Sequence, residues 1–122
     1  MIDWHPKWLE NGDNHFRFCG HWEWSNDDPT CRPYVWLEMW RTLRETPKGR
    51  WIVDSYASQW QIEHGAARQR FVLNTGQKRW AYPTKMQAWN SFLIRQRHRL
   101  NHARNNLEGV ETLAVFIEAH KP

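Results

Sequence analysis

Apolar side chains recur at helical spacing through the last third of the chain, and this stripe restricts the fold more than any other feature. At 100° per residue one stripe collects Ala88, Trp89, Phe92, Gln96, Leu100, Ala103, Leu107, Val110, Ala114 and Ile117. Gln96 is the one polar residue of this set, and Arg99 also lies inside the stripe. The pattern predicts helical structure over residues 84–119 that buries the stripe against another layer. Gly109 interrupts the pattern, so one helix with a weak point and two consecutive helices both fit. The helix starts at Lys85 if Thr84 is the cap, or earlier if Pro83 occupies its first turn.

Segments rich in aromatic and aliphatic residues precede the helix and predict strands. Tyr34 to Arg44 and Arg50 to Tyr56 flank Glu45-Thr46-Pro47-Lys48-Gly49, a turn in which proline presets φ and glycine accepts a positive φ. These two segments therefore predict a β-hairpin. A third strand is predicted over Gln69–Asn74 and a shorter fourth over Lys78–Tyr82. The predicted fold class is α+β: an antiparallel meander of three or four strands packed on one long C-terminal helix, whole or broken.

Residues 1–33 show no clean periodicity and are rich in Asp, Asn, Gly, Pro and aromatic residues, which indicates an irregular N-terminal arm with one short strand near 16–24. The chain has 122 residues, a single-domain length, so we expect one domain, 1–122, made of this arm (1–33), the meander (34–82) and the helical part (84–119). No apolar run approaches the ~18 residues of a membrane span, and the first residues do not form a signal peptide. We expect a cytoplasmic protein with no membrane partner.

Charge is distributed unevenly along the chain. Residues 64–107 contain no Asp or Glu, whereas residues 1–63 contain more acids than bases. Such asymmetry favours an anionic partner, and the alternative is a solvated basic surface without a partner. The residues expected to contact a partner protein or nucleic acid are the basic ones of this segment: Arg68, Arg70, Lys78, Arg79, Lys85, Arg95, Arg97, Arg99, His102 and Arg104.

Ten tryptophans are more than a core of this size readily hides, since each indole N–H needs a partner when buried. Some are therefore expected at the surface, where aromatic rings stack on bases or anchor protein interfaces. Trp22, Trp24, Trp80 and Tyr82 are the candidates for exposed aromatics. Core packing is the alternative for each ring.

His15, Cys19, His21 and Cys31 form the best candidate metal-binding set, because thiolate and imidazole are the ligands of a structural zinc. The spacing matches no standard finger, so reduced thiols and surface imidazoles are the favoured interpretation and no cofactor is expected. Motifs for phosphate loops, serine nucleophiles and zinc proteases are missing, and clustered carboxylates for a metal nuclease are missing too. We therefore expect a protein that is not an enzyme.

Three segments together resemble a group of small phage and prophage proteins. They are a Trp-bearing strand leading to residues 44–51 (Arg-Glu-Thr-Pro-Lys-Gly-Arg-Trp), residues 78–85 (Lys-Arg-Trp-Ala-Tyr-Pro-Thr-Lys), and Ala88, Phe92 and Arg95 at the start of an Arg- and Gln-rich helix. The resemblance covers about two-thirds of the chain and not residues 1–33. It implies a viral context, a bacterial host cell, and stoichiometric action on host machinery such as immune systems.

Two functions follow as hypotheses. The favoured one is a non-enzymatic phage-type inhibitor that binds a host protein or nucleoprotein complex of bacterial defence, such as a CRISPR system, or of nucleic-acid handling. The alternative is a protein that binds nucleic acid directly through the basic face of residues 64–107, with an affinity that falls steeply with salt.

Overall fold

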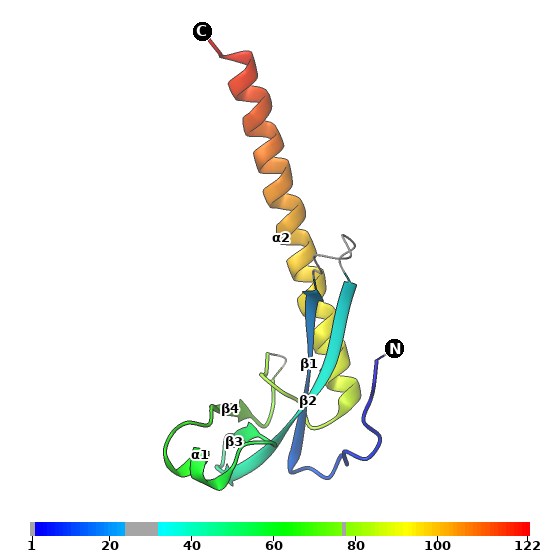
Figure 1. Cartoon of the computed structure of the whole chain (residues 1–122), viewed down its shortest axis with the longest axis vertical. Coiled ribbons are helices and arrows are strands. Elements are labelled where there is room, and N and C mark those ends of the chain that lie inside the picture. The colour runs from blue at the N-terminus through cyan, green and yellow to red at the C-terminus, as the bar shows by residue number, and fades with distance from the viewer. Residues whose placement is uncertain (1, 24–31, 77) are drawn as a thin grey trace. The chain divides into compact units, whose positions relative to one another are not determined.

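The computed structural model describes residues 2–23, 32–76 and 78–122. Its four strands form one antiparallel sheet in chain order: β1 (Asn14–Glu23), β2 (Arg32–Glu45), β3 (Gly49–Asp54) and β4 (Gln69–Leu73). The sheet is curled into a half-barrel, and two helices complete the described fold, α1 (Gln59–Glu63) and α2 (Lys85–Ala119) (Figure 1). The predicted α+β class, with an antiparallel meander and a long C-terminal helix, is confirmed. The chain divides into two compact units, Met1–Asn90 and Ser91–Pro122.

The structure differs from the prediction of an irregular N-terminal arm, because much of that segment forms the strand β1. From Asn14 onward the segment is a regular strand that pairs with β2 along its whole length, from Asn14 opposite Arg41 to Glu23 opposite Arg32. Backbone pairing with β2 stabilises this strand, so the weak local periodicity of its sequence does not prevent it from forming.

The segment between β3 and α2 differs from the prediction in two places. Lys78–Tyr82 is not a strand: Tyr82 makes a single antiparallel bridge to Phe16, with N–O distances of 2.7 and 3.0 Å. Residues 59–63, which gave no clear signal, form α1. Ser58 and Gln61 make a capping box at its start, in which the Ser58 hydroxyl accepts from the Gln61 amide and the Gln61 side chain accepts from the Ser58 amide.

Cross-strand partners lie on the same face of a sheet, so the register defines two apolar faces. Trp40, Ile52 and Val72 lie on one face and form a core cluster with Ala81, against which Trp80 packs. Phe16 and Phe18 lie on the other face and are fully buried. The ring of Phe18 contacts two further rings there: Trp4 at 5.1 Å and Trp89, at the start of α2, also at 5.1 Å.

Thr84 caps α2, as the first of the two predicted starts requires. Its hydroxyl accepts from the Gln87 amide at 3.2 Å, and the Lys85 amide donates to the carboxylate of Glu10 at 3.0 Å. The helix then continues through Gly109 without a break. Lys85–Ala119 therefore forms one helix rather than the two consecutive helices that the sequence also allowed.

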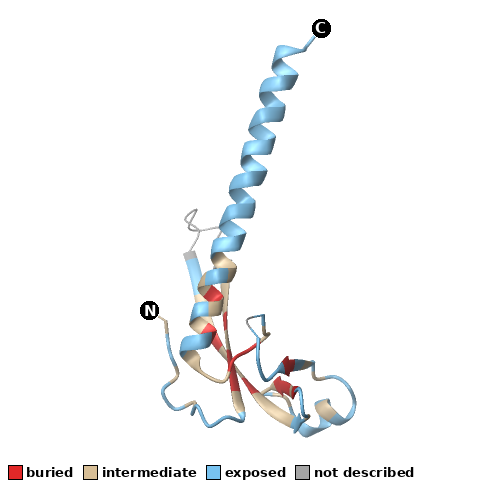
Figure 2. Cartoon of the chain, turned by 180° about the vertical axis from the view of Figure 1, so that it is seen from behind, coloured by how far each residue is buried: buried red, intermediate tan, exposed pale blue. Residues whose placement is uncertain are grey.

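Burial along α2 differs from the prediction that the whole stripe is buried. Ala88 and Phe92 are buried, but every residue from Arg97 to Pro122 is exposed, including Leu100, Leu107, Val110 and Ile117 (Figure 2). A stripe at helical spacing shows that a helix has an apolar face, but it does not show which layer covers that face. Neither described helix combines the length and apolar character needed to cross a membrane.

Candidate binding site

Trp80 is the centre of the candidate site. The guanidinium carbon of Arg17, on β1, lies 3.6 Å from the centroid of the Trp80 ring, and that of Arg70, on β4, lies 4.0 Å away. These strands are the first and last in the order of the sheet. The Trp80 ring therefore makes cation–π contacts with two guanidinium groups, one from each edge strand of the sheet.

Strand alternation explains why these side chains meet. Arg17 stands between the buried rings of Phe16 and Phe18, so its own side chain projects to the opposite face, the face of Trp40. Arg70 is the cross-strand partner of Ile52 on that same face. The ring of Trp40 packs edge-on against the Trp80 indole at 5.8 Å. Arg17 Nη1 donates to the Trp80 carbonyl at 2.8 Å and so holds the backbone of the same residue.

Arg79 precedes Trp80 in the chain, and its guanidinium contacts a different ring. Its guanidinium carbon lies 4.8 Å from the Tyr82 ring centroid, and its Nη1 donates to the Asn74 carbonyl at 3.4 Å. Tyr82 itself is only 7% exposed, so the prediction that this ring is an exposed aromatic is wrong: the backbone bridge to Phe16 draws it into the core. We call Arg17, Arg70, Arg79 and Trp80 the arginine–tryptophan cluster.

Hydrogen-bond donors exceed acceptors in this cluster. Buried Nε atoms of Arg70 and Arg79 and the indole Nε1 atoms of Trp40 and Trp80 have no hydrogen-bond partner among the described residues. No carboxylate in the described part of the chain lies within 4.0 Å of the Arg17, Arg70 or Arg79 guanidinium. Arg17 and Arg79 each donate to one backbone carbonyl, and guanidinium groups without a carboxylate partner have further N–H donors that suit phosphate or carboxylate oxygens.

His15 lies on the same face as the cluster, as the cross-strand partner of Trp40, and is 5% exposed. Burial lowers the pKa of its imidazole from the ordinary value, and the nearby guanidinium groups of Arg50 and Arg79 lower it further. The side chain is therefore neutral at pH 7. It adds no positive charge to the cluster.

The other predicted contact residues do not join this cluster. Lys85 is held by the N-terminal segment, since its Nζ donates to the His5 carbonyl at 2.6 Å. Arg68 and Lys78 are exposed in the first unit, and Arg95 lies 5.7 Å from the Phe92 ring in the second. Arg97, Arg99, His102 and Arg104 are exposed in the second unit. The predicted basic face thus contributes Arg70 and Arg79 to the cluster, and its other members lie elsewhere.

Arg17 is the residue of the arginine–tryptophan cluster that the sequence prediction missed. It lies in the acidic first half of the chain, so charge clustering could not point to it. The alternation of Phe16, Arg17 and Phe18 was the available signal, because it places Arg17 on the face opposite two apolar rings. Of the predicted aromatics, Trp80 is half-buried with Arg17 and Arg70 over its ring, the ring of Trp22 is not described, and Trp24 lies outside the described residues.

The candidate metal set is not assembled in the described structure. His15, Cys19 and His21 follow one another along β1, where four residues of extended chain span ~13 Å, too far to share one ion. The Cys19 thiol donates to the Glu38 carboxylate at 3.3 Å, and Cys31 lies outside the described residues. No group of three His, Cys, Asp or Glu side chains that could hold a metal occurs among the residues described.

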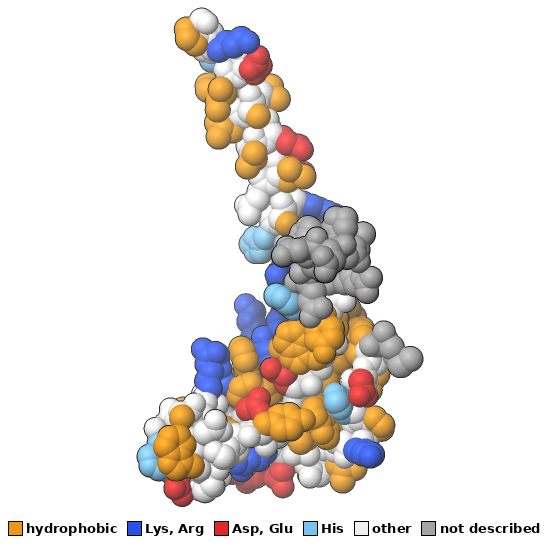
Figure 3. Space-filling model, viewed as in Figure 1, with side chains coloured by type: hydrophobic (Ala, Val, Ile, Leu, Met, Phe, Trp, Pro, Cys, Tyr) orange, Lys and Arg blue, Asp and Glu red, His pale blue; other side chains and the backbone are white. Residues whose placement is uncertain are grey.

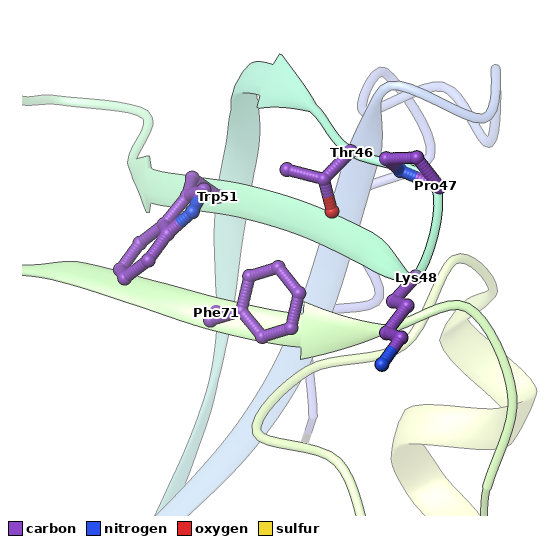
Figure 4. A pocket seen from close by; sticks show the side chains of 5 residues that line it. All are labelled: Thr46, Pro47, Lys48, Trp51 and Phe71. Atoms are coloured by element: carbon purple, nitrogen blue, oxygen red, sulfur yellow. The ribbon is translucent and has the colours of Figure 1, made fainter.

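A second surface lies at the tip of the β2–β3 hairpin. Thr46, Pro47, Lys48, Trp51 and Phe71 line a shallow, apolar hollow of about 440 Å³, with the two rings side by side (Figure 4). The Trp51 and Phe71 centroids are 5.3 Å apart, and the Arg44 guanidinium lies 5.3 Å from the Trp51 ring. By strand register these rings lie on the sheet face opposite to that of the arginine–tryptophan cluster. Tryptophan and arginine side chains are common anchors in protein interfaces.

Comparison with family models, with curated proteins and with solved structures found no match to this chain.

Proposed function

We propose that this protein is a non-enzymatic binding protein that recognises an anionic partner through the arginine–tryptophan cluster. The observation behind the proposal is the set of three guanidinium groups, fixed by ring contacts and backbone bonds, with no carboxylate partner in the described structure. Fixed guanidinium forks lose little entropy when they bind an oxyanion, which favours affinity.

The favoured partner is a protein complex of a bacterial host that handles nucleic acid or provides defence, which the protein would inhibit by binding stoichiometrically. Two observations support a protein partner. Arg17 and Arg70 lie over the Trp80 ring, which hinders base stacking there, and the Trp51–Phe71 hollow adds an aromatic surface of the type that anchors protein interfaces. The resemblance to small phage proteins supports the inhibitory role.

An infection assay tests this proposal. The chain is expressed in host strains that each carry one defined defence system, and phage plating is compared with that of the empty strain. We expect restored plating against one system, and a one-to-one complex with its purified target in light scattering. The Arg70→Gln, Arg79→Gln double variant should lose about a hundredfold or more in affinity, since each of the two charge-assisted bonds contributes about 1.5–3 kcal/mol.

The Arg68→Gln, Lys78→Gln double variant is the matched control, because it removes the same two charges at exposed residues outside the cluster. It should bind the target as the unchanged protein does. Equal losses for the control and the double variant would show that overall charge, not the cluster, determines binding.

Direct binding of nucleic acid is the second candidate, favoured because no described carboxylate lies within 4.0 Å of the three guanidinium groups. Phosphates held by Arg17, Arg70 and Arg79 would give an affinity for duplex DNA that falls with salt at a logarithmic slope of about −2 to −3. Anisotropy titrations with labelled single- and double-stranded oligonucleotides measure this slope. Binding that survives physiological salt, together with no rescue of phage plating, would favour this candidate over the inhibitor.

A further inference from the structure

The second unit contains an apolar stripe that the described structure leaves exposed. Leu100, Leu107, Val110 and Ile117 are between 50% and 65% exposed along one side of α2, and Figure 3 shows apolar side chains along this part of the helix. The stripe from Leu100 to Ile117 extends for ~26 Å at 1.5 Å per residue. A contiguous apolar stripe of this length on a soluble helix indicates an interaction surface.

The stripe has the seven-residue repeat of a coiled coil. Leu100, Leu107 and Ala114 form one set of positions, and Ala103, Val110 and Ile117 form the other. Spacings of three and four alternate without interruption from Leu100 to Ile117, as in the apolar seam between two packed helices. The partner that such a repeat fits is therefore another helix with the same repeat.

Charge along the helix is divided into two halves. Residues 96–107 contain Arg97, Arg99 and Arg104 and no acid, whereas residues 108–118 contain Glu108, Glu111 and Glu118 and no Lys or Arg. Two copies packed in opposite directions place each basic half against an acidic half. Two copies packed in the same direction place like charges together.

We propose that this protein forms a homodimer in which the Leu100–Ile117 stripes of two copies pack as an antiparallel coiled coil. In this arrangement Leu100 faces Ile117 of the second copy, Ala103 faces Ala114, and Leu107 faces Val110. Each large side chain meets a large one and each alanine meets an alanine, so two narrow alanine layers alternate with wide aliphatic ones along the seam.

The flanking charges select this register. In an antiparallel pair the residues that follow Gln96, Ala103, Val110 and Ile117 face one another across one side of the seam. These residues are Arg97, Arg104, Glu111 and Glu118. Arg97 then faces Glu118 of the second copy and Arg104 faces Glu111, which gives four opposite-charge pairs by symmetry. Glu118 also accepts from Lys121 within its own chain at 2.7 Å, so it shares its charge between two partners.

Other arrangements of the same two helices bring like charges together. Sliding the antiparallel pair by one heptad places Arg104 against Arg104 or Glu111 against Glu111 and leaves two opposite-charge pairs instead of four. A parallel pair places Arg99 against Arg104. Because like charges across a seam are unfavourable, the sequence disfavours these arrangements as well as favouring the proposed one.

Charge reversal with the full-length chain tests the proposal, with sedimentation equilibrium over the micromolar range as the measurement. The unchanged protein should be a dimer. The acidic variant Arg97→Glu, Arg104→Glu and the basic variant Glu111→Arg, Glu118→Arg each replace four attractive pairs by four repulsive ones, so each should dissociate at least about tenfold more readily. An equimolar mixture of the two variants restores all four attractions and should form the heterodimer. Helical circular dichroism of each variant shows that it is folded.

Glu108→Arg is the control, because residue 108 lies outside the seam and its flanks. It should leave the dimer unchanged. A monomeric unchanged protein, or variants that still self-associate, would overturn the proposal. So would an acidic variant that associates more tightly, because Arg104→Glu relieves the Arg99–Arg104 repulsion of a parallel pair. Equal weakening by Glu108→Arg would also overturn it.

Discussion

The guanidinium carbon of Arg17 lies 3.6 Å from the ring centroid of Trp80, although the two residues are 63 positions apart in the chain. The same guanidinium donates to the Trp80 carbonyl, so one side chain on β1 holds both the ring and the backbone of a segment that is not part of a strand. Arg70 lies over the same ring from β4. The contact thus links the two edge strands of the sheet through one indole, and it orients the donors of the candidate site.

Trp80→Leu should therefore affect stability and binding together. Loss of two cation–π contacts and of the edge-on contact with Trp40 should lower the free energy of unfolding by about 2–3 kcal/mol. Urea denaturation measures this loss. Trp60→Leu is the control, because Trp60 is 62% exposed, and it should change stability by no more than about 0.5 kcal/mol. Similar losses in the two variants would show that Trp80 does not link the sheet edges.

Gly49→Ala should destabilise the hairpin severely. A Cβ at position 49 would overlap with the Val72 carbonyl oxygen and lie 3.0 Å from the Leu73 Cα, both backbone atoms of β4. Because backbone cannot move aside as a flexible side chain does, β3 and β4 must separate locally, at a cost of about 2–4 kcal/mol. Thermal unfolding of the variant measures the effect. An unchanged transition would mean that β4 does not approach β3 as closely as the structure shows.

Local signals were sufficient for most of the fold. The Pro-Lys-Gly turn between two apolar segments predicted the β2–β3 hairpin, and Thr84 as cap was one of the two predicted starts of α2, since turn and cap chemistry depend on a few neighbouring residues. β1 was predicted only as a short strand in an irregular arm. Its length depends on pairing with β2, and residues from 32 to 41 supply that pairing, which no local window contains.

The candidate site was harder to predict, because it is assembled from three separate parts of the chain. Clustered charge in residues 64–107 included Arg70 and Arg79, which belong to the arginine–tryptophan cluster, but it also included Lys85, whose ammonium donates to the His5 carbonyl. Arg17 lies outside residues 64–107 in the sequence, but in the folded chain it belongs to the arginine–tryptophan cluster. Sheet curvature brings β1 and β4 to the same ring, and curvature of that kind is a property of the folded sheet rather than of any segment.

His15 should make stability depend on pH. Its pKa is lowered in the folded state by burial and by Arg50 and Arg79, so between that lowered value and about 6.5 the unfolded chain binds a proton that the folded chain does not. The free energy of unfolding therefore falls as pH decreases below about 6.5, by up to about 1.4 kcal/mol per pH unit from this one group.

Urea denaturation of the unchanged protein and of His15→Gln, at pH 7.5 and at successive values below 6.5, isolates this contribution. The variant should lose less stability on acidification, whatever its stability at neutral pH. Equal slopes for the two proteins below pH 6.5 would show that the imidazole at position 15 titrates alike in the folded and unfolded states, and so is not buried beside the guanidinium groups.

Gly109→Ala should strengthen the second half of α2. An added Cβ meets no atom within 4 Å, and Gly109 lies in the helix interior, where alanine is favoured over glycine by about 0.8–1.0 kcal/mol. Residue 109 also lies outside the Leu100–Ile117 seam and its charged flanks, so the substitution should not weaken the proposed dimer.

Amide hydrogen exchange around position 109 is the appropriate measurement, because a local gain in an exposed helix need not raise the stability of the sheet. We expect exchange there to slow about fourfold or fivefold, the factor that corresponds to this propensity difference, while amides in β2 and β3 exchange as before. Unchanged exchange at positions 106–112 would show that the helix is not continuous through Gly109 in solution.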